Sequence, residues 1–533
     1  MSAPEGLAAP AGGDDAAIEA LRAACAREPG KAQPLIRLAR ALLAARRAAE
    51  AVVPAEQAVA LAPQVPAALQ IREQVLAAVL AGDPELVRLE LAAALEGANA
   101  EAQLSLGEAY AALDRPHDAE RQFKRALALG RVRDASADLA SLYLSVGMAD
   151  AAEHYARAVL AAPDAGAADD LVVAMAHQTL ASLADARGDR AGADAELDQA
   201  YGRRSFFRQQ VSGCPFTTLV LVTRTAGNIP YKALLPPLRS DCVVWYMEHA
   251  RLEQLAEIDD YAVVLNAIGD PDLAIASAEV VDQVVWTTGK PVMNRPERVR
   301  ATFRHVLPAT LAGIENVLVP PTVRLTAAEI GEGGLAPAAA RAGLAAPVLV
   351  RPVGSHGGAG LVLAADAEAL AATQVPPGAD AYLTAYVDYR SPDGFFRKYR
   401  MIFVDRRPHP YHLAIGRHWM VHHQSTDMAT DPARIAEEMA FLSDPAAAIG
   451  ETALAAVAAI GARLDLDYGG VDFTLTADGR VLVFEANATM LTHLEPEDGP
   501  FAAKNPHIRP IMEAFQAHLA AVAGWCGGTV LES

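Results

Sequence analysis

The spacing of apolar residues changes between residues 203 and 215. Before this segment, from about residue 16, apolar positions recur every three or four residues and Ala, Leu, Arg and Glu dominate, which is typical of amphipathic helices. After it, short apolar runs alternate with turns and helical segments, a pattern that indicates strands joined by crossovers. We therefore predict a multidomain chain that is all-α at its N-terminal end and α/β beyond it.

The helical half repeats a unit of roughly 34 residues. Its clearest copy, at residues 106–126, alternates the small Gly107 and Ala119 with the large Tyr110 and Phe123. Small residues are expected where two antiparallel helices cross closely, and large ones fill the space between them. The unit resembles the tetratricopeptide repeat, which implies a concave groove for a peptide or protein. A structural or dimerising helical arm is the alternative.

The second half opens with four apolar runs that we expect to form parallel strands, at Thr217–Thr223, Val243–Met247, Ala262–Asn266 and Pro291–Met293. An amphipathic helix is predicted at Glu297–Leu311, followed by a further strand at Asn316–Val319.

A hairpin near the C-terminal end carries the most informative side chains. Asp478-Gly479 lies between two alternating apolar runs, which is a strong hairpin signal. Asp472 falls on the first strand, and Glu485 and Asn487 leave the same face of the second. Glu485 lies in a run too apolar for a freely solvated face, and burying two acids without a cation would cost roughly several kcal/mol. Because hard oxygen ligands suit Mg²⁺ carried by nucleotide phosphates, we predict a metal site here.

The pattern Gly-Val-Asp-Phe, hairpin, Glu-x-Asn resembles the metal-binding end of ATP-grasp enzymes, the group of glutathione synthetase, RimK-type ligases and D-alanine–D-alanine ligase. The resemblance spans roughly Pro215 to the C-terminus, and implies that Asp472, Glu485 and Asn487 hold Mg²⁺ on ATP. It also implies an ATP-grasp fold with a preceding parallel-sheet subdomain. The predicted parts are a flexible tail at 1–15, helical repeats at 16–205, an α/β subdomain at 206–300 and a nucleotide-binding and catalytic region at 301–533.

A glycine-rich loop follows the strand that ends at Arg351. Glycines let backbone amides approach phosphate oxygens, and in the family such a loop covers the triphosphate. The residues expected to bind ATP there are Gly354, Ser355, Gly357, Gly358 and Gly360. ATP-grasp proteins usually have Lys where this chain has Arg351 and Arg304, but both arginines keep a positive charge that can bind phosphate. An ordinary surface salt bridge is the alternative for either one.

Further roles follow from the resemblance by position. Ala385, Tyr386 and Val387 are expected to contact adenine, and Asp388 the ribose. Arg400 and Arg417 resemble basic residues directed at the γ-phosphate and the reacting acyl group, where a fixed positive charge stabilises developing charge. Together with Arg351 they are the expected catalytic residues.

Histidines and lysines near these strands are weaker candidates. His422 and His423 are adjacent, so on a strand they would face opposite sides and could not easily bind one ion. A polar strand end is the preferred interpretation. Lys504, His507 and Arg509, ahead of the final helix, are candidates for substrate contacts.

The resemblance implies an ATP-dependent carboxylate–amine ligase that works through an acyl phosphate, with ATP and Mg²⁺ as cofactors. Its substrate would be a small-molecule or peptide carboxylate, and the repeats could recruit a peptide or protein. One alternative is an ATP-grasp kinase that transfers the γ-phosphate without ligation. Another is a non-catalytic repeat scaffold with a decayed nucleotide site.

Charge and composition exclude several other classes. The chain of 533 residues has a formal net charge of −20, which argues against binding to nucleic acid or anionic membranes. We find neither a membrane-spanning apolar stretch nor the pattern of a signal peptide. The four cysteines lie far apart without a CxxC pair, so no disulfide framework or zinc site is expected. These features favour a cytoplasmic protein and leave homo-oligomerisation open.

Overall fold

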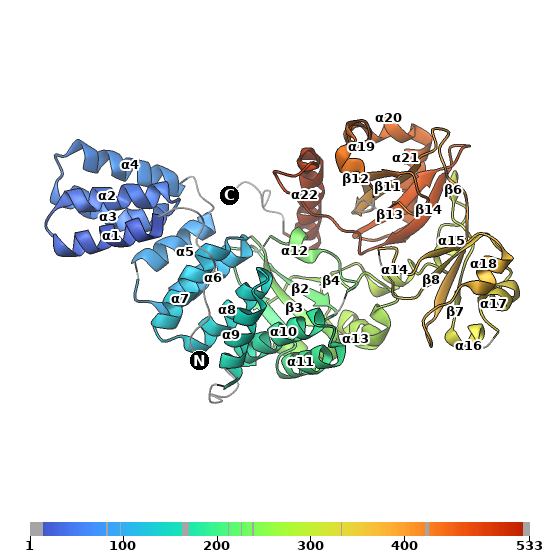
Figure 1. Cartoon of the computed structure of the whole chain (residues 1–533), viewed down its shortest axis with the longest axis horizontal. Coiled ribbons are helices and arrows are strands. Elements are labelled where there is room, and N and C mark those ends of the chain that lie inside the picture. The colour runs from blue at the N-terminus through green and yellow to red at the C-terminus, as the bar shows by residue number, and fades with distance from the viewer. Residues whose placement is uncertain are drawn as a thin grey trace. The chain divides into compact units, whose positions relative to one another are not determined.

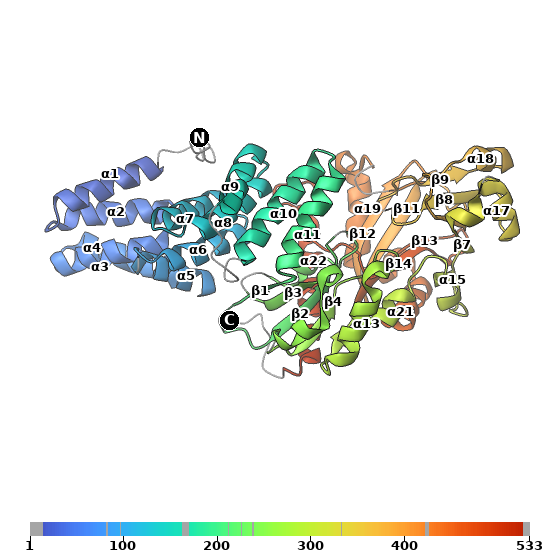
Figure 2. The same cartoon turned by 90° about the horizontal axis from the view of Figure 1, so that it is seen from below.

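The computed structural model describes residues 14–80, 84–95, 97–161, 170–211, 213–224, 226–236, 239–258, 260–331, 333–355, 357–421 and 426–525 (Figures 1 and 2). The chain forms two compact units. Residues up to Cys214, with the short segment Pro237–Asp241, belong to the first unit. Pro215–Pro236 and the residues from Cys242 onward belong to the second.

In the described part of the first unit, helices extend from residue 14 to residue 203, and the short strand β1 (Phe206–Gln209) follows. Its helices form antiparallel hairpins stacked in chain order (Figure 2). They are α1 (Asp14–Arg27), α2 (Ala32–Ala44), α3 (Ala48–Leu61), α4 (Pro66–Leu80), α5 (Pro84–Leu95), α6 (Ala100–Ala112), α7 (Pro116–Ala128), α8 (Val132–Ser145), α9 (Ala149–Ala161), α10 (Asp170–Ala186) and α11 (Arg190–Arg203).

The alternation of small and large residues in the repeat has the predicted structural basis. Gly107 on α6 lies against the ring of Phe123 on α7, and a Cβ at position 107 would be 2.5 Å from a ring atom. Ala119 and Tyr110 are buried in the same cluster. The close crossing therefore depends on a missing side chain, as the sequence pattern predicted.

The second unit begins with a sheet that contains strands β3, β2, β4 and β5 in that order. The pairs β2–β4 and β4–β5 are parallel. These four strands confirm the four predicted runs: β2 (Thr217–Val222), β3 (Asp241–Tyr246), β4 (Val263–Asn266) and β5 (Val292–Met293). Between them, the described residues form the helices α12 (Tyr231–Leu234) and α13 (Ala278–Thr287) and short 3₁₀ turns.

The single helix predicted over Glu297–Leu311 is wrong. The structure has two short helices, α14 (Pro296–Arg300) and α15 (Leu307–Thr310), with Arg304 in the turn between them. Pro308 has no amide hydrogen to donate to the carbonyl of residue 304, and its ring would clash there in a continuous helix. Because the helix is interrupted, Arg304 does not lie on a helix.

Two further sheets follow. The first is antiparallel, in the order β7-β10-β8-β9, and the second has the order β12-β11-β13-β14-β6, in which β14 and β6 alone among its described pairs are parallel. The strands are β6 (Val317–Leu318), β7 (Thr322–Leu325), β8 (Val348–Pro352), β9 (Val362–Ala364), β10 (Ala381–Ala385), β11 (Phe396–Val404), β12 (Arg407–Gly416), β13 (Tyr468–Leu475) and β14 (Val481–Asn487).

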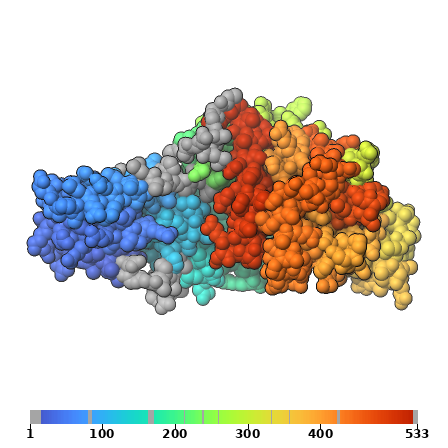
Figure 3. All heavy atoms as spheres, turned by 90° about the horizontal axis from the view of Figure 1, so that it is seen from above, coloured from blue at the N-terminus to red at the C-terminus, as the bar shows by residue number. Residues whose placement is uncertain are grey.

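Helices cover these sheets: α16 (Ala327–Ile330), α17 (Leu335–Arg341) and α18 (Ala367–Ala372) lie with the first, and α19 (Pro432–Ser443), α20 (Pro445–Ile449), α21 (Glu451–Leu464) and α22 (Asn505–Val522) with the second. Tyr399 on β11 packs edge-on against Phe441 of α19, with ring centroids 5.0 Å apart. Tyr468 on β13 packs similarly against Phe515 of α22 at 5.7 Å. The C-terminal residues, α22 among them, form the red surface beside the orange residues of the same unit (Figure 3). This order of elements confirms the predicted fold class.

Asn294 joins the parallel sheet to β13. It is fully buried with a left-handed φ of 53°. Its Nδ2 donates to the carbonyl of Tyr468 at 2.8 Å, and its Oδ1 accepts from the amides of Asp467 and Tyr468 at 2.8 and 2.9 Å. One side chain thus satisfies three backbone groups of another element.

Replacing Asn294 by Ala is expected to destabilise the second unit by about 3 kcal/mol or more, because each buried backbone group left unpaired costs about 1–3 kcal/mol. Denaturant-induced unfolding followed by circular dichroism measures the change. Asn316→Ala is the matched control, because Asn316 also has a left-handed φ (59°) but a half-buried side chain. Equal losses for both variants would contradict the proposed role of the Asn294 hydrogen bonds.

None of the helices in the described part of the chain combines the length and the apolar composition that a bilayer crossing demands.

Candidate functional site

Four charged side chains form a row across three strands of the β12-β11-β13-β14-β6 sheet. Arg400 on β11 lies opposite Asp472 on β13, and Asp472 lies opposite Glu485 on β14. Directly opposite residues of antiparallel strands project from the same face. Lys398 precedes Arg400 by two positions and shares that face. We call Lys398, Arg400, Asp472 and Glu485 the charged row.

Irregularities in the strands occur at the row itself. The register shifts between Arg400 and Met401 against β12, and between Asp472 and Phe473 against β14. Such bulges re-aim side chains and are common beside functional sites. Tyr399, the neighbour of Arg400, faces α19, so the row lies on the opposite face of the sheet.

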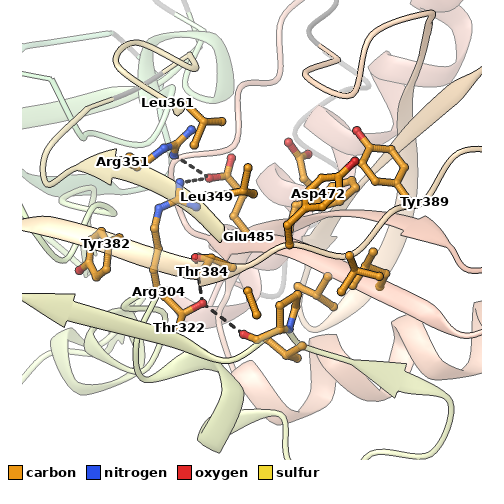
Figure 4. Close-up of a pocket in the computed structure, with 18 of the residues that line it drawn as sticks. Arg304, Thr322, Leu349, Arg351, Leu361, Tyr382, Thr384, Tyr389, Asp472 and Glu485 are labelled. Atoms are coloured by element: carbon orange, nitrogen blue, oxygen red, sulfur yellow. Dashed lines mark hydrogen bonds and ion pairs between the residues drawn. The ribbon is translucent and has the colours of Figure 1, made fainter. Parts of the chain in front are cut away.

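The two carboxylates of the row are held by cationic groups. Asp472 is 1% exposed, and it accepts from Nε and Nη2 of Arg400 at 2.6 and 2.9 Å. Lys398 Nζ lies 3.1 Å from Oδ2 of Asp472. Glu485 accepts a hydrogen bond from Arg304, and Nη1 of Arg351 lies 3.9 Å from its Oε2 (Figure 4). Four cations therefore surround two carboxylates.

Burial and charge oppose each other in this cluster. Burial alone would raise the pKa of Asp472, but the charges and hydrogen bonds of Arg400 and Lys398 hold it well below its usual range. Burial likewise opposes the lowering of the pKa of Glu485 by Arg304 and Arg351. Burial, with the neighbouring Arg304, lowers the pKa of Arg351 to about 10. Both carboxylates are ionised at neutral pH, and the positive surplus favours a bound anion.

The cluster borders a cavity of about 150 Å³. One wall comes from β7, β8 and β10 of the antiparallel sheet, and the other from β11, β13 and β14 of the sheet that carries the charged row. Aromatic side chains line it at Tyr386, Trp419 and Phe484. The hydroxyls of Thr322 and Thr384 pair at 3.0 Å (Figure 4). The cavity thus has an apolar part suited to a flat ring and a cationic part suited to phosphate.

The donors present fit Mg²⁺ only together with a ligand. No group of three or more His, Cys, Asp or Glu side chains is placed to hold a metal within the described ranges. Asp472 and Glu485 supply two ionised carboxylates, and Mg²⁺ characteristically completes its octahedron with waters and substrate phosphates. Asn487 Oδ1 accepts from the amide and the hydroxyl of Thr489, both at 3.0 Å. Its role as a ligand stays a prediction.

The structure brings several of the predicted residues to the cavity. Arg304, Arg351, Ala385, Tyr386 and Val387 line it, with Asp472 and Glu485. Both arginines form ion pairs with Glu485 at the cavity, and their phosphate-binding role stays a prediction.

The predicted loop follows β8, and all four of its glycines have a positive φ: Gly354 (75°), Gly357 (59°), Gly358 (81°) and Gly360 (67°). Non-glycine residues rarely adopt this conformation. Ser355 donates from its hydroxyl to the carbonyl of Pro352 at 2.7 Å. Leu361, directly after the loop, lines the cavity, so the loop borders the site while its phosphate-binding role stays a prediction.

Other predicted residues lie apart from the cavity lining. Asp388 is exposed and accepts from the amide of Arg390 at 3.1 Å. Arg417 is exposed, with its guanidinium 4.6 Å from the ring centroid of Phe395. Lys504 is buried between Glu438 and Glu495, at 3.3 and 3.2 Å. His507 and Arg509 are not among the lining residues, and His422 and His423 lie outside the described residues.

Sequence reasoning missed Lys398. Its signal was available, because residues two apart on a strand share a face, and Arg400 was already a candidate. Lys398 lines the cavity and contacts Asp472. It is the fourth cation of the cluster.

Lys398→Met is expected to weaken ATP binding about tenfold, because a hydrogen bond to a charged group is worth about 1.5–3 kcal/mol. Met keeps the length of the aliphatic stem, and Arg400 still pairs with Asp472 in the variant. Isothermal titration calorimetry with MgATP measures the change. Lys232→Met, at an exposed position on α12, is the control. Equal affinities of K398M and K232M would exclude Lys398 from the nucleotide site.

Comparison with known proteins finds similarity to solved structures. No protein-family model matches the chain, and a search of curated proteins finds no match either. A RimK-domain ATP-grasp protein from Sphaerobacter thermophilus DSM 20745 is 18% identical and covers 58% of this chain and 100% of its own, with a TM-score of 0.34. The D-alanine–D-alanine ligase from Bacillus anthracis, complexed with ATP, is 13% identical and covers 59% and 100%, with a TM-score of 0.35. MamA is 18% identical and covers 36% and 88%, with a TM-score of 0.18.

Proposed function

We propose that the second unit binds MgATP in the cavity and is an ATP-dependent carboxylate–amine ligase. The observation that carries the proposal is the charged cluster, in which four cations surround two ionised carboxylates beside an apolar, aromatic-walled cavity. The cationic surplus suits a polyphosphate, and the two carboxylates suit the divalent cation that accompanies it.

Each part of the cavity has a role in this proposal. Ala385, Tyr386 and Val387 flank the adenine ring. Arg304, Arg351 and Lys398 hold phosphate oxygens, with the glycine-rich loop above them. Asp472, Glu485 and Asn487 would hold Mg²⁺, which when bound neutralises phosphate charge during transfer.

The reaction has two steps. A substrate carboxylate oxygen attacks the γ-phosphorus, the bond to the β-phosphate oxygen breaks, and ADP leaves with an acyl phosphate formed. An amine then attacks the acyl carbon, phosphate leaves, and the amine loses a proton. Arg400, on β11 of the charged row, stabilises charge on the transferred group. Arg417, two positions before the cavity residue Trp419, is assigned to the acyl group. The substrate class is a small-molecule or peptide carboxylate.

The test combines binding with chemical trapping. Calorimetry should detect ATP binding that depends on Mg²⁺. Incubation with ATP, a library of amino acids and short peptides, and hydroxylamine should then yield a hydroxamate, because hydroxylamine intercepts an acyl phosphate. A phosphorylated product without hydroxamate would support a kinase instead. Absence of magnesium-dependent nucleotide binding would overturn the proposal.

A further inference from the structure

The chain that follows β14 turns back over the sheet that carries the charged row. Residues 488–495, which we call the crossing segment, form neither helix nor strand. Ala488, Met490 and Thr492 are buried, whereas Leu491 and His493 between and after them are exposed. Burial that alternates from one residue to the next is typical of extended chain. The crossing segment therefore lies extended, with every second side chain against the sheet.

Contacts of the crossing segment lead from β14 across β13 to β12. At Gly470 on β13, an added Cβ would lie 2.7 Å from the side chain of Met490. The hydroxyl of Tyr468, also on β13, donates to the carbonyl of Met490 at 2.6 Å. On β12, the hydroxyl of Tyr411 lies 3.2 Å from Nδ1 of His493. Since the strand order is β12-β11-β13-β14, the segment passes over the sheet.

The crossing segment and the nucleotide cavity lie on opposite sides of the charged row. Tyr468 and Gly470 precede Asp472 by four and two positions on β13, so the segment contacts the same face of the sheet. Lys398, which lines the cavity, precedes Arg400 by two positions. Because β11 and β13 are antiparallel, Lys398 and Gly470 lie on opposite sides of the row.

This arrangement fixes the direction from which a substrate acid can approach. In phosphoryl transfer the attacking and leaving oxygens are roughly in line. In the proposed reaction ADP leaves on the side of the cavity. The substrate carboxylate must then approach the γ-phosphorus from the other side of the row, where the crossing segment lies.

The end of the crossing segment is held by two side chains from the start of α22. Nζ of Lys504 lies 3.2 Å from Oε1 of Glu495, the last residue of the segment. Asn505 Oδ1 accepts from the amide of Glu495 at 2.8 Å, and Asn505 Nδ2 donates to its carbonyl at 2.9 Å. The side chain of Lys504 is only 3% exposed, and its Nζ lies 5.4 Å from the ring centroid of Tyr411.

Lys504 also joins this end of the segment to the edge of the sheet. Its Nζ lies 3.3 Å from Oε1 of Glu438 on α19. The same oxygen accepts from the amide of Leu413 on β12 at 3.3 Å and lies 2.7 Å from Nδ1 of His412. His412 is directly opposite Arg400 of the charged row. One buried ammonium group therefore ties the crossing segment to α19 and to the strand beside Arg400.

We propose that Lys504 is a positioning residue for the carboxylate substrate, a role that rests on the ligase activity proposed above. By holding Glu495 against Glu438, Lys504 fixes the crossing segment, and the substrate lies between this segment and the charged row. Lys504 is too deeply buried to contact the substrate itself. The direct contact expected from the sequence is thus replaced by an indirect role.

Lys504→Met is expected to raise the KM of the substrate acid about tenfold or more and to leave the KM of ATP unchanged. The variant leaves Glu438 and Glu495 without their common cation, so the end of the segment moves away from the sheet. A displacement of about 1 Å can cost about a hundredfold in rate. Steady-state kinetics measure both KM values, with the acid that gives the most hydroxamate in the trapping assay. Lys504→Arg keeps the charge and should restore the KM of the acid.

Gly461→Ala is the matched control for lost stability. An added Cβ on α21 at this position would lie 2.7 Å from the ring of Phe403, which is three positions after Arg400 and projects from the opposite face. A destabilised protein has fewer folded molecules, which lowers kcat and leaves both KM values unchanged. If Gly461→Ala raises the KM of the acid as Lys504→Met does, lost stability explains the effect and the proposal is wrong.

Hydrogen exchange of the full chain provides a readout that needs no substrate. In Lys504→Met, the amides of His493 and Glu495 should exchange about tenfold faster or more, and those of the β13–β14 hairpin should be unchanged. Equal exchange of the crossing segment in both proteins overturns the proposal. Where Lys504→Met does not fold, Glu495→Gln, at a side chain that is 12% exposed, replaces it in both assays with the same expected changes.

Failure of the ligase proposal has a different signature. The unmodified protein then shows no magnesium-dependent ATP binding or yields no hydroxamate, and both proposals are overturned. If the unmodified protein binds MgATP and yields hydroxamate while Lys504→Met keeps the KM of the acid, the role of Lys504 alone is wrong.

Discussion

Asp472→Asn is expected to lower magnesium-dependent ATP turnover about a thousandfold. Removing one preorganised charged or polar group from a reaction centre costs roughly 10²–10³-fold in rate, and this substitution also leaves Arg400 and Lys398 without their common counter-ion. The shape of the side chain is preserved, so the loss reports charge. Steady-state phosphate release, with substrates identified by hydroxamate trapping, measures it.

The same variant, Asp472→Asn, tests how much the buried ion pairs of Asp472 contribute to the free energy of unfolding. Removing one partner of a buried ion pair costs about 3–5 kcal/mol, because the remaining charge is left uncompensated. Asp478→Asn is the matched control on the same hairpin, since Asp478 is 59% exposed and contacts Arg480. We expect D478N to keep both activity and stability. Turnover of D472N within tenfold of the unmodified protein would exclude Asp472 from the reaction centre.

Gly461→Ala is expected to destabilise the second unit by about 3 kcal/mol. Inserting atoms into a packed core typically costs about 1–3 kcal/mol, and this substitution is expected at the upper end of that range. Gly461 is buried on α21, and a Cβ there would lie 2.4 Å from the carbonyl oxygen of Arg406 and 2.7 Å from a ring atom of Phe403. The turn between β11 and β12 would have to move away from the helix. In an open helix the same change would stabilise by about 1 kcal/mol.

Gly202→Ala on α11 is the control, and its expected change in stability has the opposite sign. Nothing lies within 4 Å of a Cβ built at position 202, so this variant should be neutral or slightly more stable. Denaturant unfolding of both variants, with the transition of each unit followed separately, gives the comparison. A stabilised G461A would show that α21 does not approach the hairpin as closely as described.

The local periodicity of the sequence was sufficient to predict the positions of several residues of the site. The tight turn after β13 sets the register of that hairpin, so Asp472 and Glu485 could be placed on one face from the sequence. Their pairing with β11 could not be placed, because Arg400 and Asp472 are 72 residues apart and neighbouring turn chemistry does not determine long-range register.

Other differences have equally specific causes. Arg304 was expected on a helix, but Pro308 ends that pattern and leaves Arg304 in a turn from which it reaches Glu485. Arg417 follows the last residue of β12, where strand alternation no longer predicts a direction, so its position over the ring of Phe395 could not be foreseen. The burial of Lys504 could not be foreseen either, because the two acids that pair with it belong to segments that meet only in the folded chain.

The pairing of Asp472 and Glu485 with guanidinium groups has a consequence for folding and for ligand binding. Each acid already has an internal counter-ion, so the second unit can fold without any divalent cation. This differs from domains that fold only when a structural metal is bound. When a ligand enters, salt-bridge partners are exchanged. The arginines that leave the two acids then bind the incoming polyanion.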